Sequence, residues 1–98
     1  MKVIPQDKDM IVDFTCGFWS LYDNTIIMGS LDGSYVWLFA NFDNVDIASS
    51  VFDNFILSAM NDSIVAFDFS KVNPNGEFID TIPDLLEDKS LPITYNLI

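Results

Sequence analysis

The feature that most constrains this chain is the Asp32-Gly33 dipeptide, which lies between two apolar runs at residues 25–28 and 35–39. An Asp-Gly pair in that setting is typical of a two-residue β-hairpin loop in a type I′ turn, because both central positions of that turn need a positive φ. The loop would also set the register of the hairpin. The expected cross-strand pairs are Leu31 with Ser34, Met28 with Trp37, and Ile26 with Phe39.

Both faces of this expected hairpin are apolar, so both need to be covered. Alternation puts Ile26, Met28, Ser30, Tyr35, Trp37 and Phe39 on one face, and Ile27, Gly29, Leu31, Val36, Leu38 and Ala40 on the other. We expect the aliphatic face to be the floor on which a helix packs. The aromatic face would then need cover from the C-terminal segment, from a second copy of the chain or from a partner.

The rest of the chain predicts an α+β fold in a single domain, residues 1–98. Period-two patterns predict strands at residues 2–4 (at a sheet edge), 10–18 (continuing past Gly17), 63–72, 77–80 and 91–98. Apolar residues at three- and four-residue spacing predict a helix over residues 41–62, capped by Asp43 or Asn44. Residues 73–76 predict a turn and residues 81–87 a single helical turn. The expected architecture is an antiparallel sheet of about five to six strands, starting with a three-stranded meander, with one long amphipathic helix packed on one face.

Charge is the outlying property of this composition. Fifteen Asp and Glu residues face four Lys, with no Arg and no His, for a net charge of −11. A chain with this balance has little with which to neutralise phosphates, so we expect no direct binding of nucleic acid. The acidic field either serves to attract a basic partner or simply reflects solvated carboxylates.

The residues that carry catalysis in most enzymes are missing or unfavourably spaced. Without His, every His-based triad and His metal site is excluded. No calcium-loop spacing and no glycine-rich phosphate loop is present. Three local groups of carboxylates, Asp7 with Asp9, Asp43 with Asp46, and Asp84 with Glu87 and Asp88, are expected to be loop or helix-end carboxylates. We therefore expect no enzyme activity, no metal and no cofactor.

The single cysteine and the apolar pattern bear on the compartment. Cys16 has no partner for an internal disulfide and, within an apolar run, is expected to be buried in the core. The first residues contain no signal-peptide h-region, and no apolar run is long enough to cross a membrane. The expected location is the cytoplasm.

Two acidic residues lie within the predicted strands. Asp13 lies between Val12 and Phe14, Asp68 lies between two phenylalanines, and both would point to the opposite face from the flanking Phe rings. An ordinary amphipathic strand with one solvated face explains this pattern. A second hypothesis places both carboxylates on an acidic rim around exposed aromatic side chains, a surface suited to a basic protein. The candidate partner-binding residues are Asp13, Asp23, Asp32, Tyr35, Trp37, Asp46, Asp53 and Asp68.

In size, acidity and aromatic content the chain resembles the small immunity proteins of bacterial nuclease toxins, of the colicin and contact-dependent growth-inhibition types. This resemblance implies an inhibitor that covers the active site or substrate groove of a basic toxin. The chain is also similar to phage inhibitors that imitate nucleic acid, of the anti-CRISPR and anti-restriction types. A homo-oligomeric structural module, in which the aromatic face buries against a second copy, is the third hypothesis.

Overall fold

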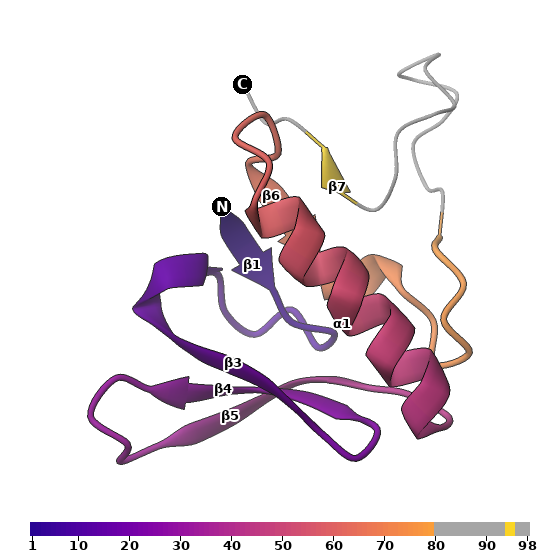
Figure 1. The fold of residues 1–98 in the computed structure, drawn as a ribbon, viewed down its shortest axis with the longest axis horizontal. Coiled ribbons are helices and arrows are strands. Elements are labelled where there is room, and N and C mark those ends of the chain that lie inside the picture. The colour runs from indigo at the N-terminus through magenta and orange to yellow at the C-terminus, as the bar shows by residue number, and fades with distance from the viewer. Residues whose placement is uncertain (80–93, 96–98) are drawn as a thin grey trace.

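Within residues 1–79 and 94–95, which the computed structural model describes, the strands form two separate sheets beside one α-helix (Figure 1). The strands are β1 (Lys2–Ile4), β2 (Val12–Asp13), β3 (Gly17–Tyr22), β4 (Thr25–Ser30), β5 (Val36–Asn41), β6 (Ala66–Asp68) and β7 (Thr94–Tyr95). The helix is α1 (Val45–Ala59), and two short 3-10 turns are η1 (Phe14–Cys16) and η2 (Phe69–Lys71). The fold is therefore α+β, as the sequence predicts.

The first sheet, which we call the mixed sheet, has the strand order β2-β1-β6-β7. β1 pairs antiparallel with β2 but parallel with β6, and β7 pairs antiparallel with β6. The expectation that residues 2–4 form an edge strand is wrong, because β6 returns from the helix to lie on the free side of β1. The expected single antiparallel sheet of about five to six strands is wrong for the same reason, since this parallel pairing builds a second sheet.

The second sheet, which we call the meander sheet, has the order β3-β4-β5, with both pairings antiparallel. This confirms the predicted three-stranded meander, but its first strand starts at Gly17. The expected strand over residues 10–18 is interrupted by η1, and only β2 precedes that turn. The expected strand over residues 63–72 is likewise shorter, because β6 gives way to η2 after Asp68.

The central hairpin keeps part of its predicted register. Met28 pairs with Trp37 as expected, but Ile26 pairs with Ala40, because a bulge leaves Phe39 as the extra residue. The loop is longer than two residues, since Gly33 N–H donates to the Ser30 carbonyl at 3.0 Å and Ser30 N–H donates to the Tyr35 carbonyl at 2.9 Å. Gly33 has a positive φ of 78° while Asp32 does not, so the loop is not a type I′ turn.

α1 is shorter than its predicted range of 41–62. Asn44 caps it, accepting a hydrogen bond from Ile47 N–H at 2.9 Å, which confirms one of the two expected caps. The chain before the cap is extended, because Asn41 belongs to β5 and Phe42 N–H donates to the Asn24 carbonyl at 2.9 Å. The helix buries Ala48, Val51, Phe55 and Ser58.

The core lies between α1 and the aromatic face of the hairpin, so the expected assignment of the two hairpin faces is reversed. Trp19 of β3 contacts Phe39 of β5 and Phe55 of α1, with ring centroids 4.7 and 5.0 Å apart. Met28 and Phe39 are buried, whereas Val36 and Leu38 of the expected helix floor are exposed. The rings of Trp19, Phe39 and Phe55 pack against one another on this face, and aromatic pairs of this kind stabilise beyond the apolar area that they bury.

The turn over residues 73–76 is confirmed, since Gly76 N–H donates to the Asn73 carbonyl at 2.8 Å and Gly76 has φ 87°. The return strand predicted at 77–80 is reduced to a single bridge between Phe78 and Val72. The helical turn expected over 81–87 lies outside the described residues. Of the strand expected over 91–98, only β7 is described, and it lies at the end of the strand order.

Candidate protein-binding surface

The side of the meander sheet that faces away from α1 carries a group of exposed apolar side chains. Because side chains alternate along a strand, the residues that do not contact the core lie on this side. They form rows that run across the three strands. The register gives the rows Phe18–Gly29–Val36, Ser20–Ile27–Leu38 and Tyr22–Thr25–Asn41. We call this surface the open face.

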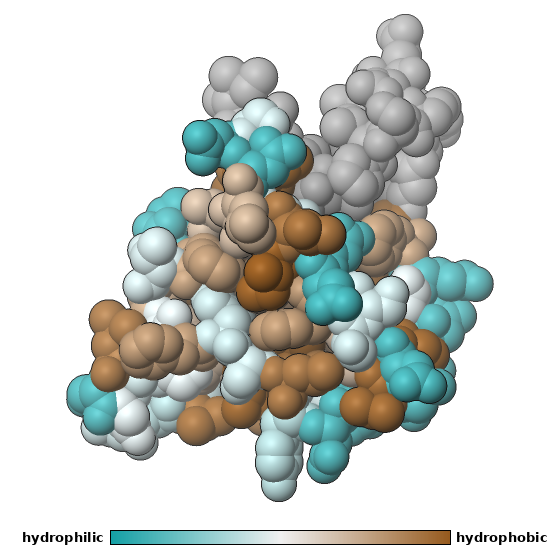
Figure 2. All heavy atoms as spheres, in the orientation of Figure 1, coloured by the Kyte–Doolittle hydropathy of each residue, from teal (hydrophilic) through white to brown (hydrophobic). Residues whose placement is uncertain are grey.

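The large side chains of the open face are well exposed. The exposed fractions are 65% for Phe18, 68% for Tyr22, 61% for Val36 and 70% for Leu38. In Figure 2, brown atoms lie over the lower part of the molecule, where β3, β4 and β5 run, and teal atoms interrupt them. Large apolar side chains exposed together on one face of a sheet are typical of an interaction site.

Gly29 makes the open face uneven. It stands between Phe18 and Val36 in the first row. A Cβ built at Gly29 would have only the Tyr35 carbonyl oxygen within 4 Å, at 3.9 Å, so the space above it is empty. A partner side chain could therefore enter between the two flanking apolar residues.

The two expected aromatic anchors are placed differently from one another. Tyr35 is 66% exposed and follows the hairpin loop. Trp37 is half-buried, because its strand position turns it towards the core opposite Met28. The two rings lie 5.8 Å apart, so Tyr35 covers part of Trp37. The expectation that Trp37 and Phe39 form an uncovered aromatic face is thus wrong, and Tyr35 alone of these three is exposed.

Asp23 and Asp32 occupy the two turns at opposite ends of β4, and both are exposed. Asp32 accepts hydrogen bonds from Ser30 Oγ at 2.7 Å and from Ser34 N–H at 2.9 Å. The hydroxyl of Ser30 and the amide of Ser34 together hold the pKa of Asp32 below its usual range. The folded state therefore favours the ionised carboxylate in this turn.

The other candidate carboxylates do not join these two in a single rim. Asp13 forms an ion pair with Lys2, at 3.1 Å between Oδ2 and Nζ. Asp46 and Asp53 are exposed on α1, and that helix packs on the opposite side of the meander sheet. The acidic residues are thus spread over several sides of the described chain.

Asp68 is not a surface residue, which corrects its assignment to an acidic rim. It is 6% exposed and accepts hydrogen bonds from the backbone N–H and the hydroxyl of Ser70. Its strand lies between β1 and β7 in the mixed sheet, where neither face is open to solvent. Asp68 caps the 3-10 turn that follows it.

Two further expectations concern reactive groups. Cys16 is exposed, which corrects its assignment to the core. The 3-10 turn η1 points this residue outwards, whereas a strand would have buried it.

Asp7 and Asp9 form one of the expected carboxylate pairs. Asp9 N–H donates to Asp7 Oδ1 at 3.3 Å, and a side-chain hydrogen bond with Asp7 raises the pKa of Asp9. This pair is solvent-exposed in a loop, as the sequence predicts. Among the described residues no group of His, Cys, Asp or Glu could hold a metal ion.

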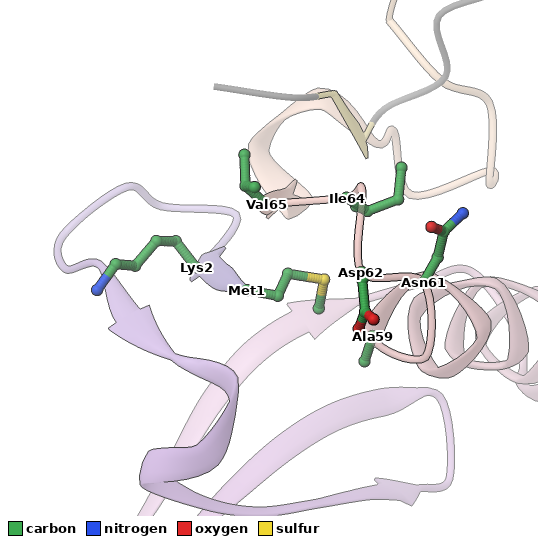
Figure 3. A pocket seen from close by; sticks show the side chains of 7 residues that line it. All are labelled: Met1, Lys2, Ala59, Asn61, Asp62, Ile64 and Val65. Atoms are coloured by element: carbon green, nitrogen blue, oxygen red, sulfur yellow. The ribbon is translucent and has the colours of Figure 1, made fainter. Parts of the chain in front are cut away.

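A hollow of about 440 Å³ lies where β1 approaches the end of α1. Figure 3 shows the Met1 side chain pointing towards Asp62 and Ala59, while Lys2 points away. The remaining lining residues are Asn61, Ile64 and Val65. Asp62 is the one carboxylate of this lining, and Lys2 points away and pairs with Asp13, so we assign this hollow no chemistry.

Several residues of the open face were missed by the sequence reasoning. Phe18 and Tyr22 were not singled out, and Val36 and Leu38 were assigned to the helix floor. The strict alternation of residues 17–22 was the available signal, because it places Phe18 and Tyr22 on the side opposite Trp19 and Leu21.

Comparisons with known proteins identify no relative: no protein-family model, no curated protein and no solved structure matches this chain. Across the described part of the chain, no helix is long and apolar enough to cross a membrane.

Proposed function

We propose that this chain is an inhibitor of the immunity-protein type, which binds a basic toxin, most simply a nuclease, and covers its active site or substrate groove in the cytoplasm. The open face is the observation that carries the proposal. It offers a partner an apolar centre built from Phe18, Tyr22, Val36 and Leu38, with a carboxylate in the turn at each end of β4.

Charge supports a basic partner over the other occupants of this surface. The chain has a net charge of −11, so a second copy meets long-range repulsion while a cationic protein is attracted. Carboxylates would accelerate the encounter, and the apolar side chains would slow dissociation once water is expelled. The chain itself performs no covalent step in this mechanism, since it acts by excluding the nucleic-acid substrate.

A purified panel of basic toxin nuclease domains, both ribonucleases and deoxyribonucleases, tests the proposal by calorimetry and nuclease protection. A toxin gene directly upstream of this one would identify the first domain to try. We expect at least one stoichiometric complex whose Kd rises tenfold or more between 50 and 300 mM NaCl. If no domain binds, or if binding is indifferent to salt, the proposal is wrong.

Leu38→Ala and Leu57→Ala form a matched pair for locating the surface. Both leucines are exposed, at 70% and 65%, but Leu38 lies on the open face and Leu57 on α1. We expect Leu38→Ala to weaken binding at least tenfold, and Leu57→Ala to weaken it less than twofold. Equal effects would place the partner elsewhere.

Sedimentation of the free chain tests whether a second copy of the chain occupies the open face. We expect a monomer. A stable dimer that Leu38→Ala dissociates would place a second copy on the open face and favour a homo-oligomeric module.

A nucleic-acid mimic would instead need carboxylates along one continuous surface. In that case added DNA or RNA would displace the chain from its partner, and Leu38→Ala would leave the affinity for the partner unchanged.

A further inference from the structure

The two edges of the meander sheet differ. The β5 edge is covered at its C-terminal end by Gln6, whose backbone N–H donates to the Phe39 carbonyl at 2.8 Å. The Gln6 side chain accepts from Asn41 N–H at 2.8 Å and donates to the Asn41 carbonyl at 3.3 Å. A single residue from the segment after β1 thus satisfies the main-chain groups of Phe39 and Asn41 at this edge.

The β3 edge has no such cover in the part of the chain that the structure describes. β3 is the first strand in the order β3-β4-β5, so only β4 pairs with it. Natural sheet edges are protected by charged side chains, proline or short length. β3 has six residues, GFWSLY, and none of them is charged or proline.

The geometry of the β3–β4 turn indicates which groups are available. Only Asp23 and Asn24 separate the paired residues Tyr22 and Thr25. The residues that flank a two-residue hairpin loop exchange hydrogen bonds, and alternate residues beyond them point outwards. The main-chain groups of Trp19 and Leu21 therefore point away from β4.

We propose that the basic partner adds an extended segment to the outer edge of β3 and becomes the fourth strand of the meander sheet. This inference rests on the proposed function and names the kind of segment that the chain accepts. In this mode of recognition, affinity comes from hydrogen bonds between the main chain of the segment and the main-chain groups of Trp19 and Leu21. Side chains of the segment that lie beside Phe18 and Tyr22 extend the open face. Lys or Arg in the segment complements the exposed Asp23 beyond the end of β3.

A synthetic nine-residue peptide of alternating Lys and Val, blocked at both ends, serves as the probe. A matched peptide carries N-methyl groups on two adjacent central residues, so that both of its edges lose a donor while charge and side chains are kept. Binding to the full, isotopically labelled chain is followed by NMR. We expect the unmodified peptide to bind at least tenfold more tightly and to slow amide exchange at Trp19 and Leu21.

Equal affinities of the two peptides, undetectable binding of both, or protection confined to other amides would overturn strand addition. None of these results bears on the nuclease panel, so the two proposals fail separately. Replacing every Lys of the probe by Glu tests the charge requirement, and undiminished binding of that peptide would overturn the basic character of the segment.

Two chain variants provide a second measurement. Ser20→Lys places the usual edge-protecting charge in the middle of β3, and Ser34→Lys makes the same change in the exposed β4–β5 loop. We expect the first to weaken peptide binding at least fivefold and the second less than twofold. Equal weakening would mean that overall charge, and not the β3 edge, controls the interaction.

Discussion

Asp68 shows how one buried side chain can be mistaken for a surface residue. Its carboxylate accepts two hydrogen bonds from Ser70 inside the protein. Asp68→Ala removes that acceptor and leaves Ser70 groups without a partner, so we expect a loss of about 1–3 kcal/mol of unfolding free energy in urea. Asp68→Asn keeps one acceptor oxygen and should recover part of this loss.

The exposed Asp53 is the control, because Asp53→Ala should change the unfolding free energy by no more than about 0.5 kcal/mol. If Asp68→Ala were as mild as Asp53→Ala, the capping role of Asp68 would be wrong. Sequence alone could not show that Asp68 is buried, since an Asp flanked by Phe has the same pattern on an open strand and on a strand covered on both sides.

Asp32 gives a prediction about pH. Its pKa is lowered in the folded chain by Ser30 and Ser34, so the folded state favours the carboxylate. The resulting stabilisation is present above the unfolded pKa and is lost as the pH falls through the folded pKa. We expect Ser30→Ala to raise the pKa of Asp32, measured by NMR titration of its carboxyl carbon. An unchanged titration midpoint would contradict the role of the Ser30 hydroxyl.

At the scale of the element, the start of β3 depends on close packing at Gly17. A Cβ at this position would lie 2.5 Å from the Gly29 carbonyl oxygen and 2.7 Å from Met28 Cγ. Because the first contact is with main chain, Gly17→Ala must shift the β3–β4 pair, and we expect a cost of about 1–3 kcal/mol in chemical denaturation.

Gly29→Ala is the matched control for that change, since its Cβ would meet nothing closer than 3.9 Å. We expect its effect to stay within about 0.5 kcal/mol. Comparable losses for the two variants would show that strand propensity, and not the close approach at Gly17, determines the cost.

The elements themselves were predictable where local pattern decides them. The cap at Asn44 and the turn at Gly76 each follow from residue types that suit one backbone conformation. The pairing of the two hairpin strands also follows from their local pattern, although the Asp32-Gly33 loop does not adopt the type I′ turn that these residues predict. The parallel pairing of β1 with β6 was not predictable, because it joins segments more than sixty residues apart through main-chain contacts that leave no periodicity. The choice between two apolar hairpin faces also depends on tertiary packing, namely on the ring of Phe55 that Trp19 contacts.

At the scale of the whole molecule, the acidic excess has two opposite consequences for salt dependence. A net charge of −11 destabilises the compact state through self-repulsion, while the same charge attracts a basic partner. Salt screens both effects. Folding should therefore strengthen with added salt while binding weakens.

We expect the free chain to gain about 1 kcal/mol of stability between 10 and 300 mM NaCl, a rise in Tm of about 4–8 °C for a domain of this size. Neutralising the exposed carboxylates of Asp53, Asp62 and Glu77 with Asn, Asn and Gln should reduce this salt increment, because less repulsion is left to screen. Calorimetry of the free chain measures this salt increment.

Titration of the same variant with a nuclease domain that binds the chain measures the affinity. Since these three side chains lie off the open face and its two turns, the variant should lose less than threefold in affinity at 300 mM NaCl, where long-range attraction is screened. A large loss at that salt concentration would show that the partner contacts these carboxylates directly, and would move the binding surface away from β3, β4 and β5.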